Sequence, residues 1–279
     1  MMMSFVKLQG TGNDFVLFDL RGETEEHDWH ALAPQLCDRH FGIGADGLLL
    51  VLPPSDAAPQ AEFRMRVINA DGSEPEMCGN GLRCFVRYLH DKGLLTGPEV
   101  AVGTGAGLLR ARILPPEEGS GFRVRLDMGR PFDMGREMLP LGDRRLDIQQ
   151  ISMGNPHCVT FVDDLDRFPF DELGPVVEAH PRFRQRTNAE FVQVLSRSRL
   201  KVKVWERGAG PTLACGTGAC AAVVAAVGRG LTDRHVKVDL PGGTLDIDWL
   251  VGGSVFLTGP AEPVFTGQIA LPALARTEA

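Results

Sequence analysis

Hydrophobic and polar residues alternate along several short segments of the chain. Successive side chains of a strand point to opposite faces, so a period of two predicts a strand with one buried and one exposed face. Short turns with glycine or proline separate many of these segments, which favours antiparallel sheets. The predicted strands of this kind cover residues 63–68, 122–126, 200–205 and 245–249.

Helical periodicity occurs in fewer places. Apolar residues recur at intervals of three and four within residues 27–40, 81–92, 170–180 and 218–229. Strand-rich halves, each with one apolar helix, predict an α+β protein built mainly from antiparallel sheets.

Two segments about half a chain apart repeat each other. Asn69-Ala-Asp-Gly-Ser-Glu-Pro-Glu-Met-Cys78-Gly-Asn-Gly is matched by Glu206-Arg-Gly-Ala-Gly-Pro-Thr-Leu-Ala-Cys215-Gly-Thr-Gly, with the same interval between lead residue and cysteine (78 − 69 = 9 and 215 − 206 = 9). Gly12-Asn13 and Gly154-Asn155 match at a similar offset, 155 − 13 = 142 against 215 − 78 = 137. We therefore expect a duplicated chain that folds as two pseudo-symmetric halves, with one cysteine on each side of a shared cleft.

The segment Leu114–Gly121 is the best candidate for a linker between the halves, because its prolines, acids and glycines do not easily continue a strand.

Composition and charge narrow the function classes. The chain has 279 residues, of which 43% are hydrophobic and 23% charged, and its net charge is −7. An acidic chain without a basic face argues against nucleic acid and anionic lipid as partners. The longest apolar runs, residues 47–52 and 219–227, are too short to cross a bilayer, and the start lacks the features of a signal peptide. We expect a cytoplasmic protein with a small-molecule ligand.

Six cysteines in a chain of this length are too few for a disulfide scaffold, so a reducing compartment would keep them as thiols. Packing is the simplest role for Cys37, Cys84, Cys158 and Cys220.

Cys78 and Cys215 are different, because each precedes a small-residue turn and then an apolar helix. Backbone N–H groups at a helix N-terminus bind anions, and we expect the same field to lower the pKa of a thiol. A base and an acid on opposite faces of a carbon could remove a proton on one side and return it on the other. The paired thiols predict such a reaction, with no metal and no cofactor.

Polar residues ahead of the cysteines form a candidate specificity shell. An arginine can bind a second carboxylate in bidentate fashion, and a glutamate or an asparagine oxygen accepts from an ammonium group. Asparagines beside glycine are also common turn formers, which is the alternative role for these residues. His157 and Glu206 could set the ionisation of the thiols. The shell comprises Asn13, Asn69, Asn155, Asn188, Glu206 and Arg207.

Other segments match known motifs in sequence, but their positions in the chain argue against the functions of those motifs. Gly42-Ile-Gly-Ala-Asp-Gly47 fits a dinucleotide-binding pattern, but it follows a predicted helix and precedes an apolar run, the reverse of the required order. Gly103–Gly107 lies between predicted strands and indicates a hairpin turn. The cysteine spacings, 84 − 78 = 6 and 220 − 215 = 5, are unlike those of structural zinc sites.

Taken together, these motifs resemble those of the diaminopimelate epimerase family. The segments around Asn69, Cys78, Asn155, Glu206 and Cys215 carry the likeness, which extends from Lys7 to Gly267. The resemblance implies a cofactor-independent isomerase that converts LL-diaminopimelate to the meso form, for lysine and peptidoglycan biosynthesis. Cys78 and Cys215 would be its acid and base, and His157 and Glu206 match residues thought to tune the thiols.

The resemblance also implies the remaining site and the domain plan. Each half would be a curled, mainly antiparallel sheet around a central helix, with halves at 1–117 and 118–262 and a returning strand at 263–279 packed on the first half. This sequence has Gly47 where many members have a glutamine, and Phe265 where many have a tyrosine. The resemblance also implies a homodimer. The implied substrate contacts are Asn13, Asn69, Gly79, Asn80, Asn155, Asn188, Glu206, Arg207, Gly216 and Thr217.

Three other hypotheses fit parts of the pattern. A proline-racemase-like enzyme also uses two cysteines, but Arg207 indicates a second charged end of the substrate. A dithiol redox protein would switch the two thiols to a disulfide. A non-catalytic binder would use its cysteines for packing alone.

Overall fold

The chain divides into two units, each with its own internal contacts. One unit comprises Met1–Arg125 with Pro260–Ala279, and the other comprises Leu126–Gly259. The structure is a computed structural model that describes residues 2–23, 27–55, 58–116 and 121–271.

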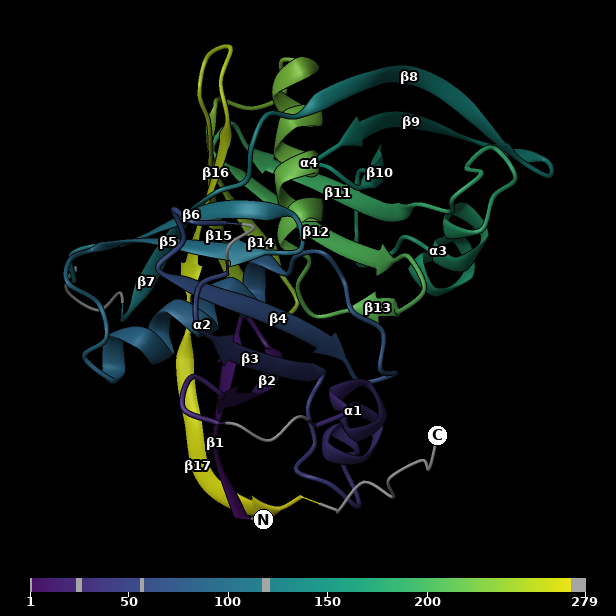
Figure 1. The fold of residues 1–279 in the computed structure, drawn as a ribbon. Helices are drawn as coiled ribbons and strands as arrows, with labels where there is room; N and C mark the ends of the chain where they lie inside the picture. The colour runs from purple at the N-terminus through teal and green to yellow at the C-terminus, as the bar shows by residue number, and fades with distance from the viewer. Residues whose placement is uncertain (1, 24–26, 56–57, 117–120, 272–279) are drawn as a thin grey trace. The chain divides into compact units, whose positions relative to one another are not determined.

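The sheet of the first unit runs in the order β17–β1–β2–β3–β4–β5–β6. The pairs are antiparallel except for β2–β3 and β4–β5, which are parallel. Figure 1 shows β17 (yellow), the last strand in the sequence, beside β1 (purple), the first. The strands are β1 (Met2–Gly10), β2 (Asn13–Asp19), β3 (Gly47–Leu52), β4 (Phe63–Asn69), β5 (Glu99–Thr104), β6 (Gly107–Ile113) and β17 (Glu262–Ala270).

Two helices pack on this sheet. Helix α2 (Gly79–Asp91) contacts β1, β2, β3, β4, β6 and β17, so it is the central helix of the unit. Helix α1 (Trp29–Cys37) contacts β3 and β4, and its residues Leu32 and Leu36 enter a core with Phe18 and Leu48. Burying such side chains contributes about 1.5–3 kcal/mol each.

The second unit has a sheet in the order β8–β9–β10–β11–β12–β14–β15–β16. Its pairs are antiparallel except for β10–β11 and β12–β14. The strands are β8 (Phe132–Leu141), β9 (Arg144–Ser152), β10 (Pro156–Phe161), β11 (Asn188–Ser196), β12 (Arg199–Glu206), β14 (His235–Leu240), β15 (Gly243–Trp249) and β16 (Val255–Pro260), with the short β13 (Gly210–Thr212) on β12 and β7 (Arg123–Asp127) on β16.

Helix α4 (Gly216–Gly228) is the central helix of the second unit. Figure 1 shows this helix among the strands of its unit, where it contacts β9, β10, β11, β12, β14 and β15. The helix is apolar along almost its whole length. Helix α3 (Phe170–Glu178) packs on β11 and β12, where Leu173 and Val177 join a core with Phe191. The α+β class, the mainly antiparallel sheets and the four helical segments are therefore confirmed.

The two units share the same order and direction of strands, and their helices follow the corresponding strands. Strands β17, β1, β2, β3, β4, β5 and β6 follow the same sequence of parallel and antiparallel steps as β8, β9, β10, β11, β12, β14 and β15. In both, one helix follows the third of these strands and the central helix follows the fifth. The repeat that the sequence indicated is thus a repeat of topology.

The observed boundaries between units differ slightly from those expected at 117/118 and 262/263. Residues after the predicted linker still contact the first unit, because Phe122 packs on Arg87 and His90 of α2. Before β17, the carbonyls of Pro260 and Ala261 accept hydrogen bonds from Arg83 and Arg87. Residues 117–120 of the predicted linker and 272–279 of the predicted returning strand lie outside the described residues.

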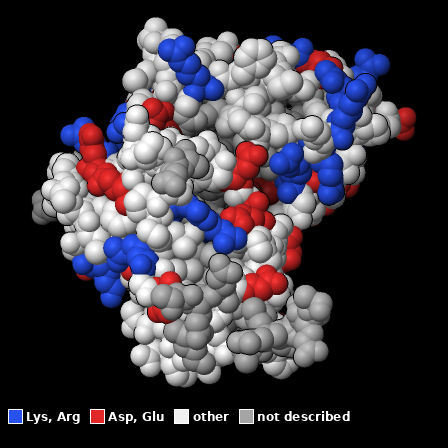
Figure 2. Space-filling model, in the orientation of Figure 1, with Lys and Arg blue, Asp and Glu red and all other residues white. Residues whose placement is uncertain are grey.

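The surface carries charges of both signs. On the face shown in Figure 2, lysine and arginine side chains are interspersed with aspartate and glutamate. Within the described ranges, none of the helices combines the length and apolarity needed to cross a membrane.

Candidate active site: two helix-capping cysteines

Cys78 and Cys215 occupy the same structural position in their units. Each has extended backbone angles, φ −137° and ψ 114° for Cys78 and φ −117° and ψ 110° for Cys215, and each is the N-cap of a central helix. The sulfur accepts from the backbone N–H three residues on, at 3.3 Å from Gly81 and 3.4 Å from Gly218. An N-cap side chain normally satisfies one of the free N–H groups of the first helical turn, and sulfur does so here.

This geometry corrects one expectation about the segments that follow the cysteines. The small residues Gly79-Asn-Gly and Gly216-Thr-Gly are the first helical turns themselves, not separate turns ahead of the helices. Gly79 and Gly216 are the first helical residues, and both are buried. Each sulfur therefore lies at the positive end of a helix macrodipole.

In the first unit the predicted asparagines meet beside Cys78. The Cys78 sulfur lies 3.9 Å from Oδ1 of Asn13, and the same oxygen accepts from Nδ2 of Asn80 at 3.1 Å. Asn69 ends β4, where its Nδ2 donates to the Ser73 hydroxyl at 2.9 Å. Asn13 and Asn80 are thus brought together with Cys78, and Asn69 shapes the segment that leads to it.

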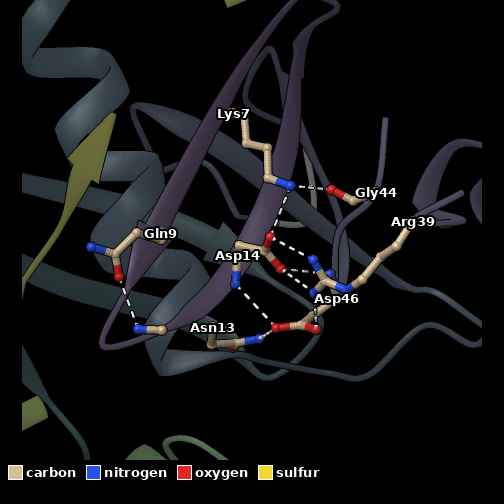
Figure 3. Close-up of polar contacts among 8 residues, drawn as sticks. Lys7, Gln9, Asn13, Asp14, Arg39, Gly44 and Asp46 are labelled. Carbon is tan, nitrogen blue, oxygen red and sulfur yellow. Dashed lines mark hydrogen bonds and ion pairs between the residues drawn. The ribbon is translucent and has the colours of Figure 1, made fainter. Parts of the chain in front are cut away.

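A charged network that the sequence analysis missed holds Asn13 in place (Figure 3). Asp46 accepts from Nδ2 of Asn13 at 2.7 Å, and Arg39 bridges Asp46 and Asp14 at 2.8 Å each. Lys7 contacts Asp14 at 2.8 Å and also donates to the carbonyl of Gly44. The segment 42–47, rejected as a dinucleotide motif, is therefore part of the support of this site.

The Asp14 carboxylate is the centre of that network. Burial alone would raise its pKa, but hydrogen bonds from Arg39 and Lys7 and the charges of both residues outweigh it and lower the pKa from 3.8 to about 2. The group is therefore ionised at neutral pH.

In the second unit a chain of hydrogen bonds leads to Cys215. The Thr217 hydroxyl lies 3.6 Å from the Cys215 sulfur, and Nδ2 of Asn155 donates to that hydroxyl at 3.3 Å. Oδ1 of Asn155 lies 2.9 Å from Nε2 of His157. Four predicted residues are thus brought together, with His157 linked to the thiol through Asn155 and Thr217.

Asn188 begins β11, Glu206 ends β12, and Arg207 follows it directly. Thr212 donates to Glu206 at 2.5 Å, and Oδ1 of Asn188 accepts from the backbone N–H of Arg207 at 2.9 Å. Buried Glu178 accepts from the N–H of Gly208 at 3.1 Å, which fixes this loop from α3. The Arg207 side chain itself is exposed.

The expectation of a lowered thiol pKa is wrong for Cys215. Burial raises the pKa of the Cys215 thiol well above its ordinary value, and the nearby charges of Glu206 and Glu190 raise it further. The Thr217 hydroxyl and the Gly218 N–H lower the pKa, as a helix N-terminus should, but by less. Burial also raises the pKa of Glu206, despite its hydrogen bonds with Thr212 and Cys215.

Glu190 is a second residue that the sequence analysis missed. It lies on β11, its side chain is fully buried, and its Oε1 is 2.7 Å from Nδ1 of the equally buried His157. A glutamate within the apolar strand Asn188–Ser196 is the signal that could have found it, because charged residues are rarely fully buried without a partner.

The other four cysteines are buried, as expected for packing residues. Burial raises the pKa of Cys37 and of Cys84 to about 12 and that of Cys158 well above its ordinary value. Surface cavities of about 410 and 470 Å³ lie between the β8–β9 turn and α3 and between the α2–β5 loop and β6, and no predicted site residue lines either.

Comparison with known sequences gives matches along nearly the whole chain. A family model described as diaminopimelate epimerase matches residues 5–132 and 150–264. The diaminopimelate epimerase of Pelotomaculum thermopropionicum is 49% identical over 280 residues, which cover 95% of this chain and 98% of that protein. The enzyme of the same name from Moorella thermoacetica is 49% identical over 284 residues, which cover 96% and 100%.

Solved structures share the fold at much lower identity. A phenazine biosynthesis protein of the PhzF family from Bacillus anthracis aligns with a TM-score of 0.74 and 18% identity, over 97% of this chain and 100% of that chain. A probable proline racemase from Agrobacterium radiobacter K84 aligns with a TM-score of 0.72 and 16% identity, over 98% and 94%. At this identity the likeness is one of fold.

Proposed function

Because this chain belongs to the diaminopimelate epimerase family, we propose that it interconverts LL- and meso-diaminopimelate by proton transfer between two thiols and the α-carbon. The observation that carries the proposal is the matched placement of Cys78 and Cys215, each the N-cap of the central helix of its unit. Two equivalent sulfurs supply one base and one acid for a single stereocentre.

The protonation of Cys215 supports an assignment of roles. Because its pKa is raised well above the ordinary value, Cys215 starts as the thiol and gives its proton to the carbanion. Cys78 then starts as the thiolate and takes the α-proton from the opposite face. The C–H electron pair stays on the α-carbon and forms the new C–H bond with the proton from Cys215. The reverse reaction exchanges the roles.

Backbone N–H groups at the two helix starts are well suited to the substrate carboxylate beside the reacting carbon. Negative charge develops there as the proton leaves, and preorganised donors are worth roughly 3 kcal/mol each. The donors at these helix starts come from Gly79, Asn80, Gly216 and Thr217. Glu206 and the asparagines would hold the ammonium group, and Arg207 the distal carboxylate.

We propose that no cofactor takes part, because the two thiols supply both the base and the acid. The same proposal places the enzyme in the cytoplasm, in lysine biosynthesis, and as a homodimer. Exposed Val264 and Phe265 on β17 offer apolar surface that a second copy could cover.

Proton exchange in deuterium oxide tests the function. The reduced protein is incubated with LL-diaminopimelate and the α-hydrogen is followed by NMR. We expect deuterium to enter at the α-carbon together with formation of the meso isomer. Protium retained without meso product would reject the proposal, and inversion of proline instead would favour the racemase alternative.

Cysteine variants separate the thiol mechanism from mere binding. Cys78→Ala and Cys215→Ala should each reduce turnover at least about 100-fold, the scale of general acid–base catalysis, while substrate binding stays measurable by calorimetry. Cys37→Ala, at a buried packing position, is the control and should keep near-parental turnover. Near-parental turnover in either of the first two variants would rule out the two-thiol mechanism.

A further inference from the structure

We propose that Glu190 is a positioning residue for Cys215, which acts through His157, Asn155 and Thr217 to direct a hydroxyl hydrogen at the Cys215 sulfur. The proposal rests on the proposed function, since it assigns Glu190 to the thiol that acts as acid. It concerns only contacts within the second unit.

Glu190 and His157 form a pair sealed from solvent. Both side chains have an exposed fraction of 0%, and 2.7 Å separates Oε1 of Glu190 from Nδ1 of His157. An O···N contact of this length needs a hydrogen between the atoms. The pair therefore holds one proton at this contact and has no net charge when Nε2 also carries its hydrogen.

The remaining hydrogen bonds then have one direction. Asn155 gives its Nδ2 hydrogen to Thr217, so its Oδ1 is the atom that accepts from Nε2–H of His157. Thr217 accepts from Asn155 at 3.3 Å, which leaves its own O–H free to donate to the Cys215 sulfur at 3.6 Å. Glu190 fixes the start of this chain by holding His157 in the orientation that presents Nε2–H to Asn155.

The first unit shows that the fold does not require this pair. Strand β10 pairs with β11 so that His157 faces Asn188, and β2 pairs with β3 so that Phe15 faces Gly47. With Asn13 equivalent to Asn155, Phe15 stands where His157 stands. Two residues further along each partner strand, Leu49 corresponds to Glu190.

The central helices give the same equivalence independently. A Cβ on Gly81 of α2 would lie 3.0 Å from Leu49, and a Cβ on Gly218 of α4 would lie 2.8 Å from Oε1 of Glu190. Gly81 and Gly218 each donate to the capping cysteine of their helix. Leu49 and Glu190 thus occupy the same place against the helix start.

Keeping a carboxylate at this place has a cost. Among the described residues, Oε2 of Glu190 is buried and has no hydrogen-bond partner. Replacing a buried ionisable pair by apolar residues of similar volume is often neutral or stabilising. An apolar pair already packs at the same place in the first unit, so the need for Glu190 is chemical and concerns Cys215.

The surroundings of Cys215 indicate what the chain of hydrogen bonds does. Glu206 on β12 and Glu190 on β11 are the charged groups that raise the pKa of this thiol, and His157 on β10 lies behind Asn155. When Cys215 gives up its proton, the sulfur becomes an anion next to these carboxylates. A hydroxyl hydrogen directed at the sulfur stabilises that anion, as does the Gly218 N–H.

Glu190→Leu tests the proposal, because it installs the residue that the first unit has at this place. Removing the hold on His157 should reduce kcat for diaminopimelate about tenfold, with KM within about twofold of the parent. In a Cys78→Ala background, ultraviolet titration of the thiolate should give Cys215 an apparent pKa about one unit higher in Glu190→Leu than in Glu190→Gln, equivalent to tenfold. The comparison is made with Glu190→Gln because both variants lack the Glu190 charge, which by itself raises the pKa of this thiol. Parental kcat in Glu190→Leu together with titration curves that coincide in Glu190→Leu and Glu190→Gln would overturn the proposal.

Glu190→Gln is the rescue variant. Its amide N–H can donate to Nδ1 of His157 and keep Nε2–H directed at Asn155, so kcat should stay within about threefold of the parent. A loss as large as that of Glu190→Leu would overturn the positioning role. Glu172→Leu is the control. Glu172 lies on α3 and forms an exposed ion pair with Arg144 of β9, so its replacement should change neither kcat nor the titration curve.

A second variant covers the case in which Glu190→Leu fails to fold. His157→Phe with Glu190→Leu restores the apolar pair of the first unit and should melt no lower than the parent. It should give Cys215 an apparent pKa about one unit above that in Glu190→Gln. A titration curve in this folded double variant that coincides with that of Glu190→Gln would overturn the proposal. The titration needs no epimerase activity, so failure of the proposed function, seen as an inactive parent, is distinguishable from failure of this inference.

Discussion

The site residues depend on charged neighbours that hold them in place. Asn13 can face Cys78 because Asp46 accepts from its amide, and Asp46 is fixed in turn by Arg39. Asp14 joins the same arginine to Lys7. The ion pairs of Asp14 with Arg39 and Lys7 require an ionised carboxylate, so this part of the support of Asn13 depends on pH.

Asp14→Asn should lower the free energy of unfolding by about 1 kcal/mol at pH 7, a value reduced for the solvent screening of half-exposed Arg39. The folded-state pKa, about 2, lies below the ordinary value of 3.8, so the stabilisation is fully present above pH 4 and is lost as pH falls through about 2. Urea unfolding of parent and variant at pH 7 and pH 3 should therefore show a difference that shrinks in acid. Asp143→Asn, at an exposed turn, should show no such difference at either pH.

The elements that carry the cysteines followed from sequence patterns. Both central helices, the alternating strands and the hairpin at 103–107 were predicted because each depends on residues close together in the chain. The starts of α2 and α4 at Gly79 and Gly216 were missed by two residues, since cysteine is an unusual N-cap.

A glutamate within an apolar strand can indicate that Glu190 is a buried charge, but the side-chain partners of Glu190 and Asp46 could not be predicted in the same way. They depend on strand register between segments more than 30 residues apart, as with His157 and Glu190, which are 33 residues apart. The raised pKa of Cys215 was missed for the same reason, because it results from burial and from carboxylates on other strands.

Gly218→Ala tests how closely the start of α4 packs. Its new Cβ would lie 2.8 Å from Glu190 and 3.2 Å from the Cys215 sulfur, so we expect a loss of about 1–3 kcal/mol in unfolding free energy and a lower kcat. Gly228→Ala, at the end of the same helix, meets no atom within 4 Å and should be neutral or stabilising by about 0.5–1 kcal/mol. Thermal unfolding and turnover of the two variants check this, and equal effects would contradict it.

At the scale of the whole molecule, the last strand completes the sheet that the first strand begins. Strand β17 pairs with β1 from Met2↔Ala270 to Gln9↔Glu262, and Gly267 allows the Phe5 ring to pack directly on its backbone. The first unit is therefore finished only after the second has been synthesised. Contacts of such long sequence separation are expected to slow folding.

A chain truncated after Pro260 should lose the order of β1 and β2 while β11 and β12 stay folded. The reason is that β1 would lose its β17 partner and Phe5 would lose the edge contact with Phe265. Hydrogen exchange followed by mass spectrometry checks this strand by strand. A chain lacking only residues 272–279 is the control, and equal protection of β1 in both truncated chains would contradict the role given to β17.

The shared strand plan of the two units has a consequence for how such an enzyme could arise. An ancestor made of two identical subunits would have carried the same residues beside both sulfurs. Only after fusion into one polypeptide could Phe15 and Leu49 stand in one unit while His157 and Glu190 stand in the other. A single polypeptide can therefore give each thiol its own neighbours, which two identical subunits cannot do.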